Sequence, residues 1–261
     1  TINLLDLIFD IKYHIAGYFE ETWIWFAIHD PTFKTDILQF TKLFTIHTYN
    51  RTGDECWTLL GRSHRLDGPA IIRLNGDQFY GINDRIHSEG ETPSMITALG
   101  DRHWYTNGKP HSRFFNGELQ PSMILSNGTK KWHRYGKLHR GLDENGMILP
   151  SIESNDKSKY YSWRGKDYRE HNLPTVELSN GHRVWIRNNK IHRDTCEHSP
   201  MCKCSNVQPA LITATGTRHW MINGKYWRND DLPVVKHANG KCEWINSSGE
   251  FVSGYDIRNM I

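Results

Sequence analysis

The residues of this sequence best suited to chemistry are three cysteines and a histidine within nine positions: Cys196, His198, Cys202 and Cys204. Three thiolates and one imidazole can complete the tetrahedral shell that zinc takes in structural sites. A zinc ion would order a loop that has few apolar side chains to fold around. The Cys-x-Cys spacing is tighter than the Cys-x-x-Cys of common zinc modules, so a flexible loop with free thiols is the alternative.

A second group that could do chemistry is a set of histidines that recur along the chain: His64, His87, His111, His139 and His192. Because they recur at a constant position of a repeat, we expect a column in which each histidine hydrogen-bonds a turn. The arginines that follow three of them, Arg65, Arg140 and Arg193, are expected to be exposed.

Motifs of enzymes are missing from the sequence. It contains no phosphate-binding loop, no Gly-x-Ser-x-Gly elbow and no His-Glu-x-x-His. Isolated acids such as Asp67, Asp143 and Asp194 have no partner at an informative spacing. We therefore expect a protein without catalytic residues.

An aromatic residue opens each copy of the internal repeat that would position these groups. A glycine or a substitute follows four residues later, and a histidine or a second aromatic follows three residues after that, as in Trp104-Tyr-Thr-Asn-Gly-Lys-Pro-His111. Repetition at a period of 20–50 residues indicates a stacked array. The eight aromatic anchors are Trp57, Tyr80, Trp104, Trp132, Tyr161, Trp185, Trp220 and Trp244.

A proline and a glycine form the second half of the repeat. Each proline lies seven residues before a glycine, and each glycine lies four residues before an anchor. These glycines are Gly76, Gly100, Gly128, Gly181, Gly216 and Gly240. One copy is degraded, because Lys157 stands at the glycine position. Asn-Gly at 75–76, 127–128, 180–181 and 239–240 predicts tight type I′ turns between strands.

Side-chain size also recurs in columns. The residue after each proline is small, from Ala70 to Val234, and the next residue is apolar, from Ile71 to Val235. Such columns are expected where like hairpins stack on one another. The predicted fold is therefore mainly β, an elongated solenoid or ribbon of stacked antiparallel β-hairpins over residues 51–261.

Residues 1–50 lack the repeat. Leu4, Ile8, Ile11 and Ile15 follow a helical period, and Asp30-Pro31 marks a break. We predict a small N-terminal helical cap, because the end of a stacked array needs a cover. A separate docking role for this segment is the alternative.

The composition of the chain limits the classes of molecule that we expect it to bind. The chain has 261 residues, of which 37% are apolar and 12% aromatic, and its net charge is +3. The small charge excess, and the expected use of the anchors in packing, argue against nucleic acid as a partner. No apolar run reaches the length that spans a bilayer, so no membrane span is expected. Five cysteines, three of them crowded together, do not form a secreted disulfide framework, and we expect a reducing compartment.

The phrase Asn-Gly-Lys-x-His-Arg, followed by Pro-Ala or Pro-Ser and then Asn-Gly, resembles the MORN repeat. Arginine after the histidine, at 65, 140 and 193, marks a variant class, since MORN units have glycine there. The stretch Ile11-Lys-Tyr-His-Ile-Ala-Gly-Tyr-Phe19 resembles the F-box-like leaders of repeat proteins of giant DNA viruses of the Marseillevirus type.

The resemblance implies a structural role. We expect a scaffolding protein of a large DNA virus particle, a minor capsid or cement component that contacts capsid proteins, located in the virion or in the host cytoplasm. The alternative is an adaptor whose F-box-like leader, residues 4–28, recruits a host ubiquitin ligase. Specific contacts are expected at the loops that escape the repeat, 112–120, 140–149 and 194–208.

Overall fold

The computed structural model describes residues 45–59, 61–88, 90–170, 172–193, 208–228, 232–246 and 248–255. All regular secondary structure in these ranges is β-strand, which confirms the predicted class. Most of the predicted helical cap and all four predicted zinc ligands, Cys196, His198, Cys202 and Cys204, lie outside the described residues. The chain divides into two compact units, residues 1–109 and 110–261.

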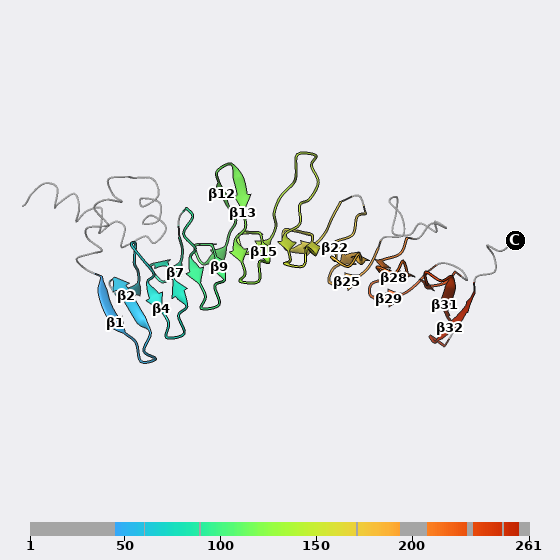
Figure 1. Cartoon of the computed structure of the whole chain (residues 1–261), viewed down its shortest axis with the longest axis horizontal. Coiled ribbons are helices and arrows are strands. Elements are labelled where there is room, and N and C mark those ends of the chain that lie inside the picture. The colour runs from blue at the N-terminus through green and yellow to red at the C-terminus, as the bar shows by residue number, and fades with distance from the viewer. Residues whose placement is uncertain are drawn as a thin grey trace, which may run out of the picture. The chain divides into compact units, whose positions relative to one another are not determined.

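In the first unit, short strands join side by side in one antiparallel ladder (Figure 1). Its order is β1 (Ile46–Tyr49), β2 (Glu55–Leu59), β4 (Ile71–Ile72), β5 (Gln78–Phe79), β8 (Met95–Ile96) and β9 (Arg102–His103). Strand β3 (Arg62–Ser63) pairs with the end of β2, and β6 (Gly81–Ile82) forms a separate hairpin with β7 (Arg85–Ile86). Strand β1 falls inside the range predicted as the helical cap, so the sheet begins earlier than expected.

The second unit repeats this ladder over more copies. Its strands in ladder order are β14 (Met123–Ile124), β15 (Lys130–Lys131), β18 (Ile152–Glu153), β19 (Lys159–Tyr160), β22 (Val176–Glu177), β23 (Arg183–Val184), β26 (Leu211–Ile212), β27 (Arg218–His219), β30 (Val235–Lys236), β31 (Lys241–Ile245) and β32 (Phe251–Tyr255). Each strand pairs with the next, and the first does not pair with the last, so this ladder does not close.

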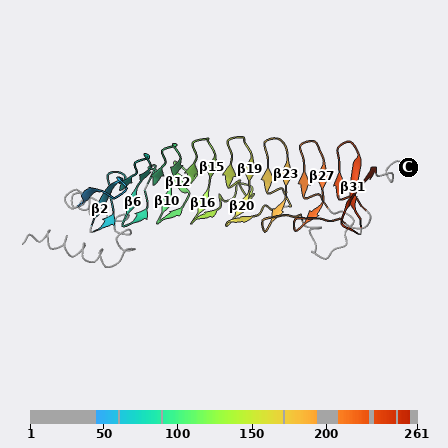
Figure 2. The ribbon, with the colours of Figure 1, turned by 90° about the horizontal axis from the view of Figure 1, so that it is seen from below.

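After each ladder strand that leads into an anchor, the chain forms a small hairpin outside the ladder. In the second unit these hairpins are β16 (His133–Arg134) with β17 (Lys137–Leu138), β20 (Ser162–Trp163) with β21 (Lys166–Asp167), β24 (Ile186–Arg187) with β25 (Lys190–Ile191), and β28 (Met221–Ile222) with β29 (Lys225–Tyr226). Figure 2 shows them along one side and the ladder along the other. The first unit also carries β10 (Tyr105–Thr106), and β11 (Lys109–Pro110) lies where the chain passes between the units.

The second unit therefore has two rows of turns. The sheet-turn row joins strands of the ladder and comprises residues 125–129, 154–158, 178–182, 213–217 and 237–241. The hairpin-turn row closes the small hairpins and comprises residues 134–137, 163–166, 187–190 and 222–225.

The prediction of type I′ turns at 75–76, 127–128, 180–181 and 239–240 was wrong. Gly128 has a φ of 88°, but the asparagine before it is not in the left-handed region, which a type I′ turn requires. The N–H of Gly128 donates to the carbonyl of Leu125 at 2.8 Å, and the N–H of Leu125 donates to that of Thr129 at 2.9 Å. This is a three-residue loop, a type I turn followed by a left-handed glycine.

Type I′ turns lie in the hairpin-turn row instead. Asn223 and Gly224 have φ angles of 52° and 80°, and Tyr135 and Gly136 have 49° and 82°. A two-residue loop with both central residues at positive φ matches the twist of the strands that it joins. Asn-Gly alone does not distinguish the two turns, because both place a residue that tolerates positive φ at the glycine position.

Five of the eight anchor rings are buried in the core, whereas Trp57, Tyr80 and Trp244 are partly buried. Trp104, Trp132, Tyr161, Trp185 and Trp220 are buried. The small residue after each proline is also buried, and in six copies its carbonyl accepts a hydrogen bond from the backbone N–H of the preceding anchor. In this way Trp132 donates to the carbonyl of Ser151 at 2.9 Å. The buried small residues are Ala70, Ser94, Ser122, Ser151, Thr175, Ala210 and Val234.

Candidate functional site

Five arginines cover the anchor rings of their own repeats. The guanidinium carbon lies about one van der Waals layer above each ring, a cation–π geometry. The distances to the ring centroids are 4.1 Å for Arg65 on Trp57, 3.8 Å for Arg140 on Trp132, 3.7 Å for Arg169 on Tyr161, 4.0 Å for Arg193 on Trp185 and 3.8 Å for Arg228 on Trp220.

These arginines also tie down the chain that follows them. Arg193 donates to the carbonyl of Pro209 at 3.0 Å and to the Asn172 side chain at 3.0 Å. The expected exposure of Arg65, Arg140 and Arg193 was therefore wrong, because all three are partly covered by stacking. Burial, and then the charge of Arg183, lowers the pKa of Arg193 to about 10, so it remains charged at neutral pH.

The recurring histidines bind turns of the next repeat. In the second unit, Nδ1 of His139 accepts a hydrogen bond from the backbone N–H of Arg164 at 3.4 Å, and Nδ1 of His192 accepts one from Asn223 at 3.1 Å. An imidazole that accepts at Nδ1 is in its neutral form. In the first unit, burial lowers the pKa of His64 to about 4. His139 and His192 therefore serve as acceptors for turns of the next repeat, and the buried imidazole of His64 stays uncharged at neutral pH.

Anchor tryptophans bind the chain 13 residues before them through their indole N–H groups. The indole N–H of Trp132 donates to the carbonyl of Leu119 at 3.2 Å, and that of Trp185 donates to Asn172 at 2.7 Å. A buried indole needs such an acceptor. The variable loop 112–120 is therefore fixed at its end by Trp132.

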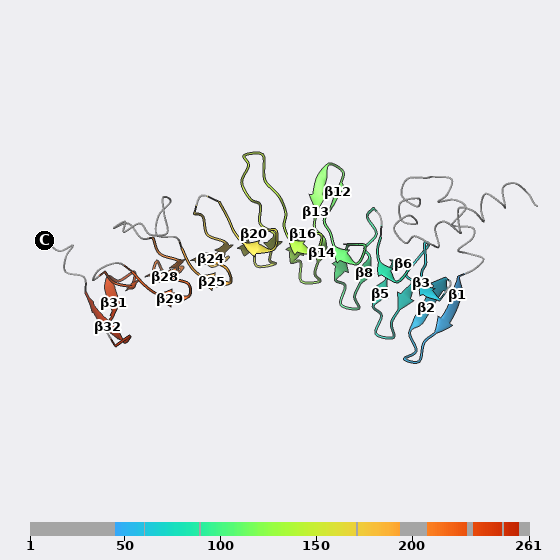
Figure 3. The same cartoon turned by 180° about the vertical axis from the view of Figure 1, so that it is seen from behind.

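The first variable loop of the second unit is an ordered hairpin, β12 (Arg113–Phe115) with β13 (Glu118–Gln120). Its type I′ turn, Asn116-Gly117, has φ angles of 50° and 79°. Phe114 is 77% exposed, so the hairpin presents an aromatic ring to solvent. Figures 1 and 3 show it standing out from the ladder, away from the sheet-turn row. The Asn-Gly pair between Phe115 and Glu118 is a hairpin signal that could have been recognised in the sequence.

The second variable loop, residues 141–149, is also a built structure. Asp143 caps its turn by accepting backbone hydrogen bonds from Asn145 at 2.9 Å and Met147 at 2.8 Å. The carboxylate of Glu170, from the following repeat, accepts the N–H of Ile148. Ile148 is buried, whereas Leu142, its partner across the loop, is half exposed. In Figures 1 and 3 this loop stands on the same side as β12–β13.

The third variable loop, residues 194–208, and its four predicted zinc ligands are almost wholly outside the described residues. Within the described ranges, no group of three or more His, Cys, Asp or Glu side chains is arranged to hold a metal ion. In the same part of the chain, no helix has the length and apolarity required to cross a bilayer.

The chain matches no protein-family model, and no curated protein matches it. Its function is therefore argued from the surfaces described above.

Proposed function

We propose that this protein is a non-enzymatic scaffold that binds other proteins through the two hairpins that project from its second unit. The observation that carries the proposal is the β12–β13 hairpin. It is paired in register, rooted by the Trp132 indole and exposes Phe114. An aromatic ring held out on a rigid element loses little conformational entropy when it binds, which favours its use as an anchor in an interface.

The neighbouring projection, residues 141–149, stands on the same side and carries a second exposed apolar residue, Leu142. Loops that escape a repeat while their bases stay fixed are where a scaffold acquires specific contacts. A role inside a large DNA virus particle, with capsid proteins as partners, rests on the resemblance to viral repeat proteins. The hairpins supply the contact chemistry such a role requires.

Replacing the two exposed apolar side chains with serine tests the proposal. The double variant Phe114→Ser, Leu142→Ser should remain folded, because both side chains are largely in solvent. The matched control is Leu99→Ser, since Leu99 is 79% exposed but lies in the first unit. Proteins that cross-link to the wild type and the control in infected-cell extracts should be lost from the double variant. An unchanged set in the double variant would exclude the projecting hairpins as the contact site.

A further inference from the structure

The hairpin-turn row is strongly basic. Its four hairpins, residues 133–138, 162–167, 186–191 and 221–226, contain seven lysines and arginines and one carboxylate, Asp167, a net charge of +6 against +3 for the whole chain. All seven cations are exposed, and Asp167 is not. They are Arg134, Lys137, Arg164, Lys166, Arg187, Lys190 and Lys225.

One lysine occupies the same position in every hairpin of the row, immediately after the turn. Lys137, Lys166, Lys190 and Lys225 form no ion pair within the described ranges of the chain. Each repeat adds two strands to the ladder, so successive lysines are about 10 Å apart and the four extend over about 30 Å.

The row is held rigidly from one repeat to the next. The turn N–H of Gly165 donates to the carbonyl of Leu138 at 2.9 Å, and that of Gly224 donates to Ile191 at 2.8 Å. The stem of Lys137 lies against Gly165, where a Cβ would come within 3.3 Å of it. The glycine leaves room for the lysine stem, which directs the ammonium group outward. Because the turns that carry the cations are already positioned, a ligand would not have to order their backbone.

Aromatic rings alternate with these charges. Tyr135 is 63% exposed in its turn, next to Arg134 and Lys137. Trp163 lies directly across its hairpin from Lys166. Neither is an anchor. The Tyr135 ring centroid lies 4.5 Å from that of His111, and the partly buried Trp163 ring lies edge-on to His139 at 4.3 Å, so each ring keeps part of its surface in solvent.

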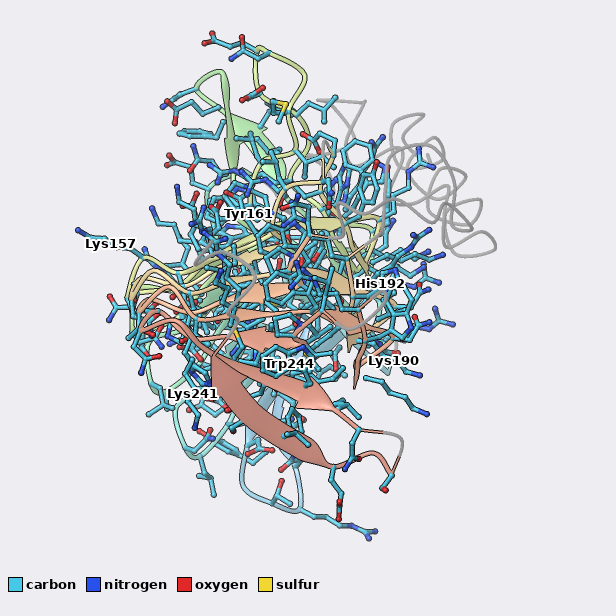
Figure 4. The ribbon with its side chains drawn as sticks, turned by 90° about the vertical axis from the view of Figure 1, so that its right-hand side faces the viewer. Lys157, Tyr161, Lys190, His192, Lys241 and Trp244 are labelled. Carbon is cyan, nitrogen blue, oxygen red and sulfur yellow. The ribbon has the colours of Figure 1, made fainter. Side chains whose placement is uncertain are left out.

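The positive charge of the hairpin-turn row also affects the pKa of a neighbouring histidine. Burial, and then the charges of Arg134 and Arg164, lowers the pKa of His139, which lies beneath the row. Figure 4 shows that Lys190 lies at one edge of the second unit and that Lys157 and Lys241 lie at the opposite edge, with Tyr161 and Trp244 between them. The opposite, sheet-turn row contains mainly serine, threonine, asparagine and glycine, with few charges.

We propose that the hairpin-turn row binds single-stranded nucleic acid, with its backbone along the lysines and bases stacked on Tyr135 and Trp163. Evenly spaced cations match a linear polyanion, and the solvent-facing parts of the Tyr135 and Trp163 rings between them can serve as stacking platforms for unpaired bases. A duplex would keep its bases away from such rings. The expectation that nucleic acid is not a partner rested on the small net charge of the whole chain and on the anchors, most of which are buried. The surface proposed here uses other residues.

The first test is fluorescence anisotropy with labelled U12 and T12 at several salt concentrations. The variant Lys137→Gln, Lys166→Gln, Lys190→Gln, Lys225→Gln removes one cation per hairpin. The control Lys130→Gln, Lys157→Gln, Lys159→Gln, Lys241→Gln makes the same change of charge on the ladder and sheet-turn side. Circular dichroism establishes that both variants are folded.

We expect the hairpin-turn variant to lose about thirtyfold or more in affinity, and the slope of log K against log salt to fall by about 0.7 for each phosphate contact removed. The control should retain the affinity of the wild type within about threefold. Equal losses in both variants would show attraction by bulk charge and would overturn the proposal. Binding to phosphatidylserine vesicles with none to either oligonucleotide would overturn it too.

The second test isolates stacking with Tyr135→Asn. Asparagine occupies this turn position in the repeats of Asn188 and Asn223 at similar φ, so the fold should tolerate it. Affinity for U12 should fall about fivefold or more, as loss of base stacking predicts, whereas binding of inorganic polyphosphate should not change. Equal loss for both ligands, or for neither, would contradict a stacking role for Tyr135.

Discussion

The two rows of turns in the second unit come from the same repeats, yet they present different surfaces. In two turns of the sheet-turn row, the side chain after the left-handed residue accepts a hydrogen bond from the next repeat. Thr129 accepts from the N–H of Asn155 at 3.3 Å, and Ser158 accepts from that of Ser179 at 3.0 Å. In the hairpin-turn row, histidines such as His139 and His192 perform this task.

This difference shows that successive repeats can stay hydrogen-bonded to one another while the side chains of one row of turns remain available to a ligand. Because the histidine reaches the next turn from the base of the hairpin, the residue after the glycine is not needed for stacking. Lysine occupies that position in all four hairpins of the row, and its charge faces solvent. In two turns of the sheet-turn row, the corresponding side chains, Thr129 and Ser158, are small and accept a hydrogen bond from the next repeat.

The largest difference expected between the two kinds of turn is in how the free energy of unfolding changes as the pH falls. His64, in the first unit, is fully buried and its pKa is about 4 against an ordinary 6.5, so the unfolded chain binds more protons in this interval. Stability therefore falls as pH drops from about 6.5 to about 4, by on the order of 3 kcal/mol for this one group. Urea denaturation at pH 7, 5.5 and 4, followed by tryptophan fluorescence, measures the loss.

Carboxylates that accept hydrogen bonds in the turns of the ladder affect stability in a lower pH interval. The pKa of Asp77 is lowered, first by the hydrogen bond from the N–H of Ala98, so its contribution is lost only below an ordinary carboxyl pKa. His64→Gln should remove part of the slope between pH 6.5 and 4, whereas Asp77→Asn should leave that interval unchanged. A slope that is the same in the wild type and in His64→Gln would refute the assignment.

Each arginine that stacks on an anchor ring and bonds the neighbouring chain is called an arginine clamp. Removing one of them should lower the stability of the hairpin side of its repeat. Arg193→Gln loses the stacking on Trp185 and the hydrogen bonds to Pro209 and Asn172, which we expect to lower the free energy of unfolding by about 2 kcal/mol. Arg183→Gln, an exposed change on the ladder, should stay within about 0.5 kcal/mol of the wild type. Equal effects of the two variants in urea denaturation would mean that the clamp contributes no stability.

Restoring glycine in the degraded copy of the sheet-turn row should increase the stability of the protein. Lys157 occupies the glycine position with a φ of 70°, a conformation that disfavours residues with a Cβ. Lys157→Gly should raise the free energy of unfolding by about 1 kcal/mol, and Gly128→Lys should lower it by about as much. A destabilised Lys157→Gly variant would show that the lysine side chain makes a compensating contact.

The smallest expected effect lies in the one turn of the hairpin-turn row that lacks glycine. Asn188 and Asn189 both have positive φ, and asparagine tolerates this conformation better than most residues. Asn189→Gly should therefore increase stability by only about 0.5 kcal/mol. A change above about 1 kcal/mol in either direction would mean that the Asn189 side chain has a further role.

The sequence predicts the repeat, the anchors and the small column after each proline because these follow from fixed spacings. The turn types were assigned to the wrong row, since loop length depends on which residues pair across the ladder, and Asn-Gly occurs in both rows. The clamp by Arg193 and its relatives was missed because an arginine after a turn histidine is usually exposed. The lysine that follows each hairpin turn was visible in the sequence, but its alignment into one exposed row becomes apparent only from the stacking.

The most direct test of the central claim, that the hairpin-turn row alone offers a positioned line of cations, is a lysine-acetylation footprint with and without bound U12. Mass spectrometry then reports the protection of each lysine. We predict protection of Lys137, Lys166, Lys190 and Lys225 and unchanged acetylation of Lys130, Lys157, Lys159 and Lys241. Protection spread evenly over both sets would contradict the account.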